Sequence, residues 1–108
     1  MDKFKQGDII FMDFDPTKGH EQAGVRPALV VSNNDFGRVM GLYAVCPITN
    51  NTKNFPTHVP LSGTTKTSGS VLCEHFRTVD LEKKQATFRE RCPEEILEDV
   101  LSIIHSCF

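Results

Sequence analysis

Residues 19–32 read Gly19-His20-Glu21-Gln22-Ala23-Gly24-Val25-Arg26-Pro27-Ala28-Leu29-Val30-Val31-Ser32, a polar loop bracketed by glycines that runs directly into an apolar segment. The apolar segment predicts a buried strand over residues 28–32. Pro27 has no N–H for a ladder hydrogen bond, and it favours extended geometry for the residue before it. We therefore expect Arg26 to occupy the first position of this strand, with its guanidinium at the rim of the fold.

The rest of the chain predicts further short strands and a helix at the C-terminal end. Apolar or alternating segments indicate strands at residues 8–14, 41–47, 57–61, 71–79 and 85–90. Pro93 followed by two glutamates is typical of a helix start. The helix carries an apolar stripe at helical spacing, made of Ile96, Leu97, Val100, Leu101, Ile104 and Phe108. A short helical turn is also expected at residues 35–38.

This pattern predicts a mainly β fold, with five or six short strands in a tightly curled antiparallel sheet and a C-terminal helix packed on it. The chain of 108 residues is short enough to be one domain, residues 1–108, with a single core. No apolar run is longer than a few residues, so we expect neither a signal peptide nor a membrane span, and a cytoplasmic protein.

The charge is distributed unevenly along the chain. The net charge is −2, but residues 93–108 contain four acidic residues and no lysine or arginine. Removing these four leaves ten acidic residues against twelve basic ones, so the first 92 residues carry about +2. This mild excess permits RNA binding at a local patch and argues against sequence-blind tracking along a polyanion.

Cysteine spacing suggests a metal site only weakly. Cys46, Cys73, Cys92 and Cys107 occur without signs of secretion, so we interpret them as reduced thiols. Cys73 and His75 would share one face of a strand, but His105 and Cys107 on a helix would point about 200° apart. We therefore expect structural thiols and no metal.

Several separated motifs, in order, resemble the MazF/PemK (Kid) family of toxin endoribonucleases of type II toxin-antitoxin systems. The loop at residues 19–27 matches the family's G-[SH]-E-Q-x-G-x-R-P pattern. Residues 7–16 look like the opening strand of the family and Pro47-Ile48-Thr49 like its P-[IV]-T strand end. Residues 70–80 are similar to its late strand. The resemblance implies an SH3-like small barrel, a homodimer with an RNA groove built by both subunits, and a cognate MazE/PemI-like antitoxin whose acidic tail occupies that groove.

Cleavage of RNA without a metal requires a base, an acid and donors for the crowded phosphorane. Arg26 offers a planar fork that matches two phosphate oxygens. The resemblance aligns Thr49 with the active-site threonine of the family, and Glu74 with an acid used by some members. Arg26 and Thr49 are thus the predicted core pair, with His20 and Glu74 as candidates for the proton transfers, and no cofactor is expected.

Further residues are predicted to contact the substrate. They lie in loops or in the late-strand motif and comprise Lys18, Gly19, Glu21, Gln22, Asn50, Lys53, His75 and Arg77. His75 replaces a glutamine that is common in the family, and Leu72 stands where one branch has arginine. The alternative interpretation of Lys18 and Lys53 is that they are solvated surface charges with no role in binding.

The sequence therefore favours a sequence-specific endoribonuclease that cuts single-stranded RNA to 2′,3′-cyclic phosphate and 5′-hydroxyl ends and so inhibits translation and growth. Two alternatives stay open. One is a non-catalytic SH3-like module that binds peptide or nucleic acid, and the other is a toxin of related fold that poisons a topoisomerase.

Overall fold

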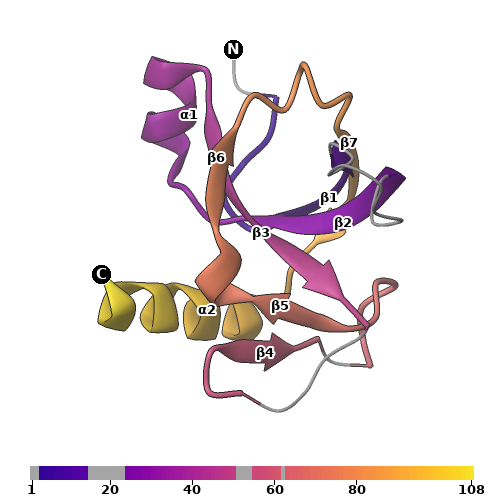
Figure 1. Cartoon of the computed structure of the whole chain (residues 1–108), viewed down its shortest axis with the longest axis vertical. Helices are drawn as coiled ribbons and strands as arrows, with labels where there is room; N and C mark the ends of the chain where they lie inside the picture. The colour runs from indigo at the N-terminus through magenta and orange to yellow at the C-terminus, as the bar shows by residue number, and fades with distance from the viewer. Residues whose placement is uncertain (1–2, 15–23, 51–54, 62) are drawn as a thin grey trace, which may run out of the picture.

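The computed structural model describes residues 3–14, 24–50, 55–61 and 63–108. Within these residues, seven strands and two α-helices are present (Figure 1). In chain order they are β1 (Asp8–Phe14), β2 (Gly24–Val30), α1 (Asn34–Met40), β3 (Tyr43–Thr49), β4 (His58–Pro60), β5 (Ser70–Leu72), the short 3-10 helix η1 (Cys73–His75), β6 (Arg77–Val79), β7 (Thr87–Arg91) and α2 (Glu94–Cys107).

The strands form one antiparallel sheet in the order β4-β5-β3-β2-β1-β7, and β6 also pairs with β3. β3 therefore has different neighbours along one edge, pairing with β6 at its start and with β5 at its end. The predicted mainly β architecture with a C-terminal helix is confirmed. The helix expected around residues 35–38 is also present as α1, which Asn33 caps by accepting a hydrogen bond from the Phe36 N–H at 2.8 Å.

The start of β2 differs from the sequence-based expectation. Arg26 was expected at the first strand position, but β2 begins at Gly24, so Arg26 is its third residue and lies opposite Met12 of β1. The strand begins earlier because β1 pairs with these residues from Phe14–Gly24 onward, and pairing with one neighbouring strand is enough to hold the backbone extended.

The ladder between β2 and β3 ends where proline enters. Its register runs from Val30–Val45 through Leu29–Cys46 to Ala28–Pro47. The next residue toward the start of β2 is Pro27, which has no N–H to donate. At Arg26, β2 is therefore still paired with β1 but is no longer paired with β3.

The single strand expected over residues 71–79 is wrong. η1 interrupts it and separates β5 from β6. The interruption lets consecutive segments pair with different parts of β3, since Val71 lies opposite Ile48 and Arg77 lies opposite Val45. The strands expected at residues 8–14, 41–47, 57–61 and 85–90 are confirmed with ends displaced by at most two residues, whereas β2 begins four residues before the expected residue 28.

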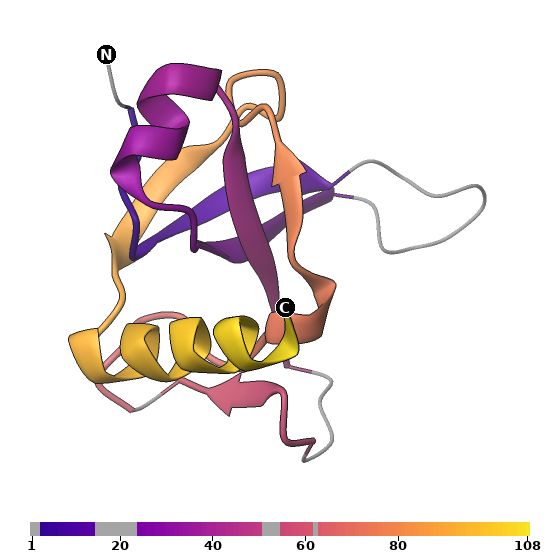
Figure 2. The same ribbon diagram turned by 90° about the vertical axis from the view of Figure 1, so that its left-hand side faces the viewer.

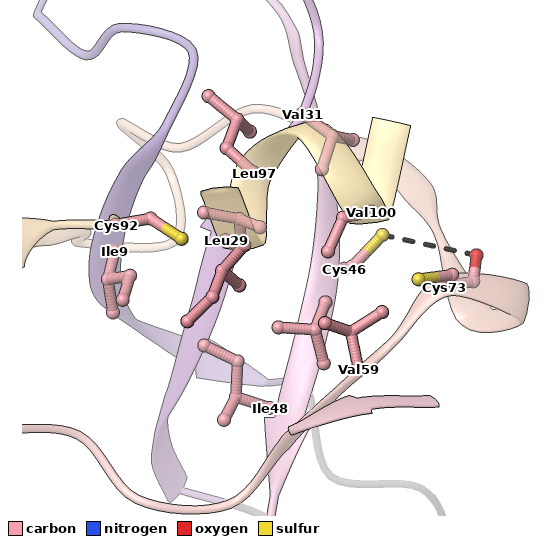
Figure 3. Close-up of a cluster of buried hydrophobic side chains, with 12 residues drawn as sticks. Ile9, Leu29, Val31, Cys46, Ile48, Val59, Cys73, Cys92, Leu97 and Val100 are labelled. Atoms are coloured by element: carbon pink, nitrogen blue, oxygen red, sulfur yellow. Dashed lines mark hydrogen bonds between the residues drawn. The ribbon is translucent and has the colours of Figure 1, made fainter. Parts of the chain in front are cut away.

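Alternating side chains divide the interior into two apolar clusters. Ile9 and Leu29 belong to the cluster under α2, whereas Met12 and Ala28 belong to the cluster on the opposite face of the same strands. Figure 3 shows Leu97 and Val100 in the first cluster, together with buried Cys46 and Cys92. Figure 2 shows α2 lying across the fold beside β4. Neither α-helix among the described residues has the length and apolar character needed to span a bilayer.

We predict that docking of α2 depends on this buried stripe. Leu97 is 5% exposed, so Leu97→Ala should lower the free energy of unfolding by about 2–5 kcal/mol. The neighbouring exposed Glu98 provides a control, and Glu98→Ala should change it by less than about 0.5 kcal/mol. Urea denaturation at one fixed protein concentration measures both variants. Equal effects of the two substitutions would contradict the docking of α2 through its apolar face.

Candidate active site

Arg26 lies on the sheet face that carries the second apolar cluster. Directly opposite residues of antiparallel strands share a face, and Arg26 is opposite the fully buried Met12. Ala28, two residues on, is buried in the same cluster. Arg26 itself is only half-buried. The aliphatic part of its side chain can therefore extend the apolar face, while its guanidinium group remains accessible to solvent.

Thr49, the last residue of β3, lies on the same face. Pro47 is opposite Ala28, and Thr49 is two residues further along β3. Continuing that register by two residues sets Thr49 level with Arg26. The two residues predicted as the core pair are therefore brought to one face, beyond the last bonded pair of β2 and β3.

Gly69 holds the backbone of Thr49 from the other side. Its φ is +113°, and a Cβ at this position would lie 2.5 Å from the Thr49 carbonyl oxygen. The positive φ and the close approach each require glycine here. Ser70, the next residue, pairs with Thr49 in the β3–β5 ladder. Thr49 is thus fixed by its partner strand immediately before the chain leaves the sheet.

A polar network anchors the loop that leads to Gly69. The Thr67 hydroxyl donates to a Glu90 carboxylate oxygen at 2.7 Å, and Arg89 Nε donates to the same hydroxyl at 2.9 Å. The backbone N–H groups of Lys66 and Thr67 also donate to Glu90, at 3.0 and 2.8 Å. Burial raises the pKa of Glu90, but these hydrogen bonds outweigh it and the pKa lies below its ordinary value. The ionised carboxylate therefore ties the loop to β7.

Arg77 adds a second guanidinium to the face of Arg26. It is opposite Val45, which belongs to the second apolar cluster, and its Cζ lies 5.2 Å from the centroid of the Phe14 ring. Such stacking restrains a long side chain while leaving its N–H groups available to other acceptors. Two arginines and a threonine therefore lie on one face of the sheet formed by β1, β2, β3 and β6.

Glu74 belongs to a separate cluster at the end of β5. Its Oε2 lies 2.8 Å from Nε2 of His58 and 3.6 Å from Nε2 of His75. Burial raises the pKa of the Glu74 carboxyl, but side-chain hydrogen bonds from Thr57 and His58 outweigh burial and leave the pKa below its ordinary value. Glu74 is therefore ionised at neutral pH.

β5 joins the two clusters. Ser70 at its start pairs with Thr49, and η1 with Glu74 follows its end. β4 pairs alongside, with Pro60 opposite Ser70 and His58 opposite Leu72. The register thus places Arg26, Thr49 and Arg77 on one sheet face, with Arg77 opposite Val45, and places Glu74 and His75 on η1 between β5 and β6.

The other predicted residues divide by what the structure describes. Asn50 is exposed, and its side-chain oxygen accepts a hydrogen bond from the Ser68 hydroxyl at 2.9 Å. His75 is exposed on η1. The remaining predictions lie outside the described residues, namely Lys18, Gly19, His20, Glu21, Gln22 and Lys53.

Three further residues shape the site that the sequence alone did not single out: Thr57, His58 and Gly69. Gly69 had a detectable signal, because it ends a polar loop directly before a strand. No such signal was present for Thr57 and His58. They come close to Glu74 only because their segment pairs with a strand twelve or more residues away.

The cysteines are free thiols in this structure. Burial raises the pKa of Cys73 and of Cys92 to about 11. Burial likewise raises the pKa of Cys46. Protonated thiols are poor nucleophiles and metal ligands. Cys73 and His75 lie on η1 and not on one strand face as expected, and no group of three or more His, Cys, Asp or Glu suited to a metal occurs among the described residues.

The arrangement suits chemistry at a phosphate diester. Guanidinium groups match the paired oxygens of phosphate, and a threonine hydroxyl can donate to a third oxygen. A carboxylate that is ionised at neutral pH can accept a proton. Each of these groups is held by strand pairing or by a recorded hydrogen bond.

Comparison with known proteins agrees with this chemistry. A family model described as PemK-like, MazF-like toxin of type II toxin-antitoxin system matches residues 5–108. Endoribonuclease PemK of Escherichia coli is 39% identical over 101 residues, which cover 90% of this chain and 76% of the relative. Endoribonuclease toxin MazF of Escherichia coli strain K12 is 38% identical over 91 residues, covering 83% and 81%.

Solved structures show the same fold. The crystal structure of MazF from Deinococcus radiodurans matches with a TM-score of 0.84 and 35% identity, covering 95% of this chain and 94% of that one. A chain in the crystal structure of MazE-MazF from the same organism matches with a TM-score of 0.85 and 35% identity, covering 95% and 93%. With a family match over nearly its whole length and relatives above 30% identity, this chain belongs to the PemK-like, MazF-like toxin family of type II toxin-antitoxin systems.

Proposed function

We propose that this chain is a metal-independent endoribonuclease that cuts single-stranded RNA. The oxygen of a ribose 2′-hydroxyl attacks the adjacent phosphorus atom, and the bond from phosphorus to the 5′-oxygen breaks. The products are a 2′,3′-cyclic phosphate and a 5′-hydroxyl end. One proton leaves the 2′-hydroxyl for a base, and one proton reaches the 5′-oxygen from an acid. DNA lacks the attacking hydroxyl and should resist.

Arg26 and Thr49 bind the reacting phosphate in this proposal. The observation that carries it is their placement on one face, where the β2–β3 ladder has ended. A guanidinium stabilises the charge that develops on the equatorial oxygens of the phosphorane, and the Thr49 hydroxyl donates to one of them. Arg77, stacked on Phe14, binds a neighbouring phosphate of the same strand.

Glu74 accepts the proton of the 2′-hydroxyl. A carboxylate whose pKa is lowered has no proton to give near neutral pH, so of the acid and base roles only the base role suits it. The acid is then His20 or Arg26, and an imidazole is the side chain that ordinarily exchanges a proton near neutral pH. The side chain of Glu74 is 38% exposed and so is accessible to a bound nucleotide.

The groups that surround these residues select the substrate. Single-stranded RNA suits the site because unstacked bases can be splayed out and read on their edges. Asn50 and His75 are exposed beside Thr49 and Glu74 and are proposed as base readers. Glu21 and Gln22 are proposed for the same task, whereas Lys18, Gly19 and Lys53 contact the backbone.

The partners follow from the family. We propose that a cognate MazE/PemI-like antitoxin inhibits the chain in the cytoplasm by laying an acidic segment along the RNA groove, where it competes with the phosphate chain. We also propose a homodimer whose subunits both line that groove. The MazE-MazF crystal structures of Deinococcus radiodurans support the antitoxin as a partner class.

We predict that purified protein with EDTA cuts a long, weakly structured RNA at one short motif. Arg26→Ala should slow this cleavage by about 10²–10³-fold, the usual loss when one donor to a developing oxyanion is removed. Arg38→Ala is the matched control, because it removes a guanidinium from the exposed surface of α1 and should leave the rate unchanged. Sequencing of the fragment ends measures both the rate and the motif.

Other results would contradict the nuclease proposal. Binding of RNA without cleavage of several diverse RNAs by folded protein would favour a non-catalytic SH3-like module. Inhibition of a topoisomerase without RNA cleavage would favour a topoisomerase-poisoning toxin. Equal cleavage by wild type and Arg26→Ala would show that Arg26 is not in the active site.

We also predict that Gly69→Ala impairs cleavage by displacing Thr49. A Cβ at Gly69 would meet the Thr49 carbonyl carbon at 2.8 Å, so the strand end must move. A displacement of about 1 Å can lower kcat by about 10²-fold. Gly63→Ala is the control in the same loop, since a Cβ at Gly63 meets nothing within 4 Å. Wild-type kcat in folded Gly69→Ala would contradict the role of Thr49.

A further inference from the structure

The carboxylate of Glu74 is held by a histidine to which the nuclease proposal gives no role. His58 Nε2 lies 2.8 Å from Glu74 Oε2. The His58 side chain is only 10% exposed, and its ring packs edge-to-face on Phe55 with centroids 5.1 Å apart. Because β4 pairs with β5 and sets His58 opposite Leu72, the sheet fixes the His58 backbone, and Phe55 from the turn before β4 packs on its ring.

We propose that His58 is a positioning residue of the nuclease site, which orients the Glu74 carboxylate toward the attacking 2′-hydroxyl through the Nε2–Oε2 hydrogen bond. This inference rests on the proposed nuclease function and assigns His58 no contact with RNA. An ionised carboxylate can only accept hydrogen bonds, so Nε2 carries the proton and donates it. Together with the hydrogen bond from Thr57, this contact holds the carboxylate in one orientation.

The two histidines beside Glu74 differ in a way that favours His58. His75 Nε2 is 3.6 Å from the carboxylate, beyond hydrogen-bond distance, and its side chain is 63% exposed. His58 is within hydrogen-bond distance and almost buried. A buried, packed donor loses little entropy on holding its acceptor, whereas an exposed side chain must be ordered first.

Burial raises the pKa of Glu74, but this pKa is lowered by hydrogen bonds from Thr57, from His58 and from its own backbone N–H. The other titratable groups around it are His75 and Cys73 of η1 and Cys46 of β3, and burial and the charge of Glu74 raise the pKa of both thiols. α2 contributes Cys107, which acts on Cys73. The buried thiols are neutral, so loss of the His58 donor should raise the pKa of Glu74. Activity that needs the carboxylate would then be lost at a higher pH as the solution is acidified.

The test compares pH–rate profiles of His58 variants on an RNA with one cleavage motif. His58→Ala should lower kcat by about 10²-fold with a much smaller change in KM, and should move the acidic limb to higher pH. His58→Gln keeps an N–H donor at similar reach and should restore most of kcat. His105→Gln, at an exposed position on α2, is the control and should match wild type.

A titration without RNA separates this inference from the nuclease proposal. The ¹³C signal of the Glu74 carboxyl should titrate below its ordinary range in wild type and higher in His58→Ala. If His58→Ala does not fold, the ¹⁵N shifts of the His58 ring in wild type show which ring nitrogen carries the proton. A proton on Nδ1 alone would refute the hydrogen bond from Nε2 to Glu74. A wild type that cuts no RNA would refute the nuclease function, whereas an active wild type with an unchanged profile in His58→Ala would refute only the role of His58.

Discussion

The end of the β2–β3 ladder at Ala28–Pro47 is the constraint on which the candidate site depends. Pro27 cannot donate the next hydrogen bond, so β2 continues along β1 alone while β3 turns to β5 as its partner. Because the ladder stops, Arg26 and Thr49 can present polar groups from rigid strands.

β5 connects the end of β3 with the polar cluster around Glu74. It is only three residues long, yet it pairs with both β3 and β4. Gly69 before it allows close contact with the Thr49 backbone, and Glu90 ties the preceding loop to β7. Glu74 follows it, bonded to His58 of β4. The threonine proposed to bind phosphate and the carboxylate proposed to accept a proton are thus both next to one short strand.

Much of this organisation could be predicted from the sequence, because its signals are local. Alternation predicted β1, and the stripe through Leu97 and Val100 predicted α2. The break at η1 could not be predicted, since residues 70–79 are extended by composition and only their pairing with different parts of β3 separates β5 from β6. For the same reason the face shared by Arg26, Thr49 and Arg77 depends on register, and His58 depends on a distant strand. The resemblance predicted Arg26 and Thr49, and the strand register places them on one face.

The central claim is that Arg26 and Thr49 bind one phosphate. The most direct measurement is a crystal structure with an RNA that carries the cleavage motif and a 2′-deoxyribose at the scissile position, so that it binds without being cut. We predict that the scissile phosphate lies within hydrogen-bond distance of the Arg26 guanidinium and the Thr49 hydroxyl. An RNA bound with its scissile phosphate away from both residues would contradict it.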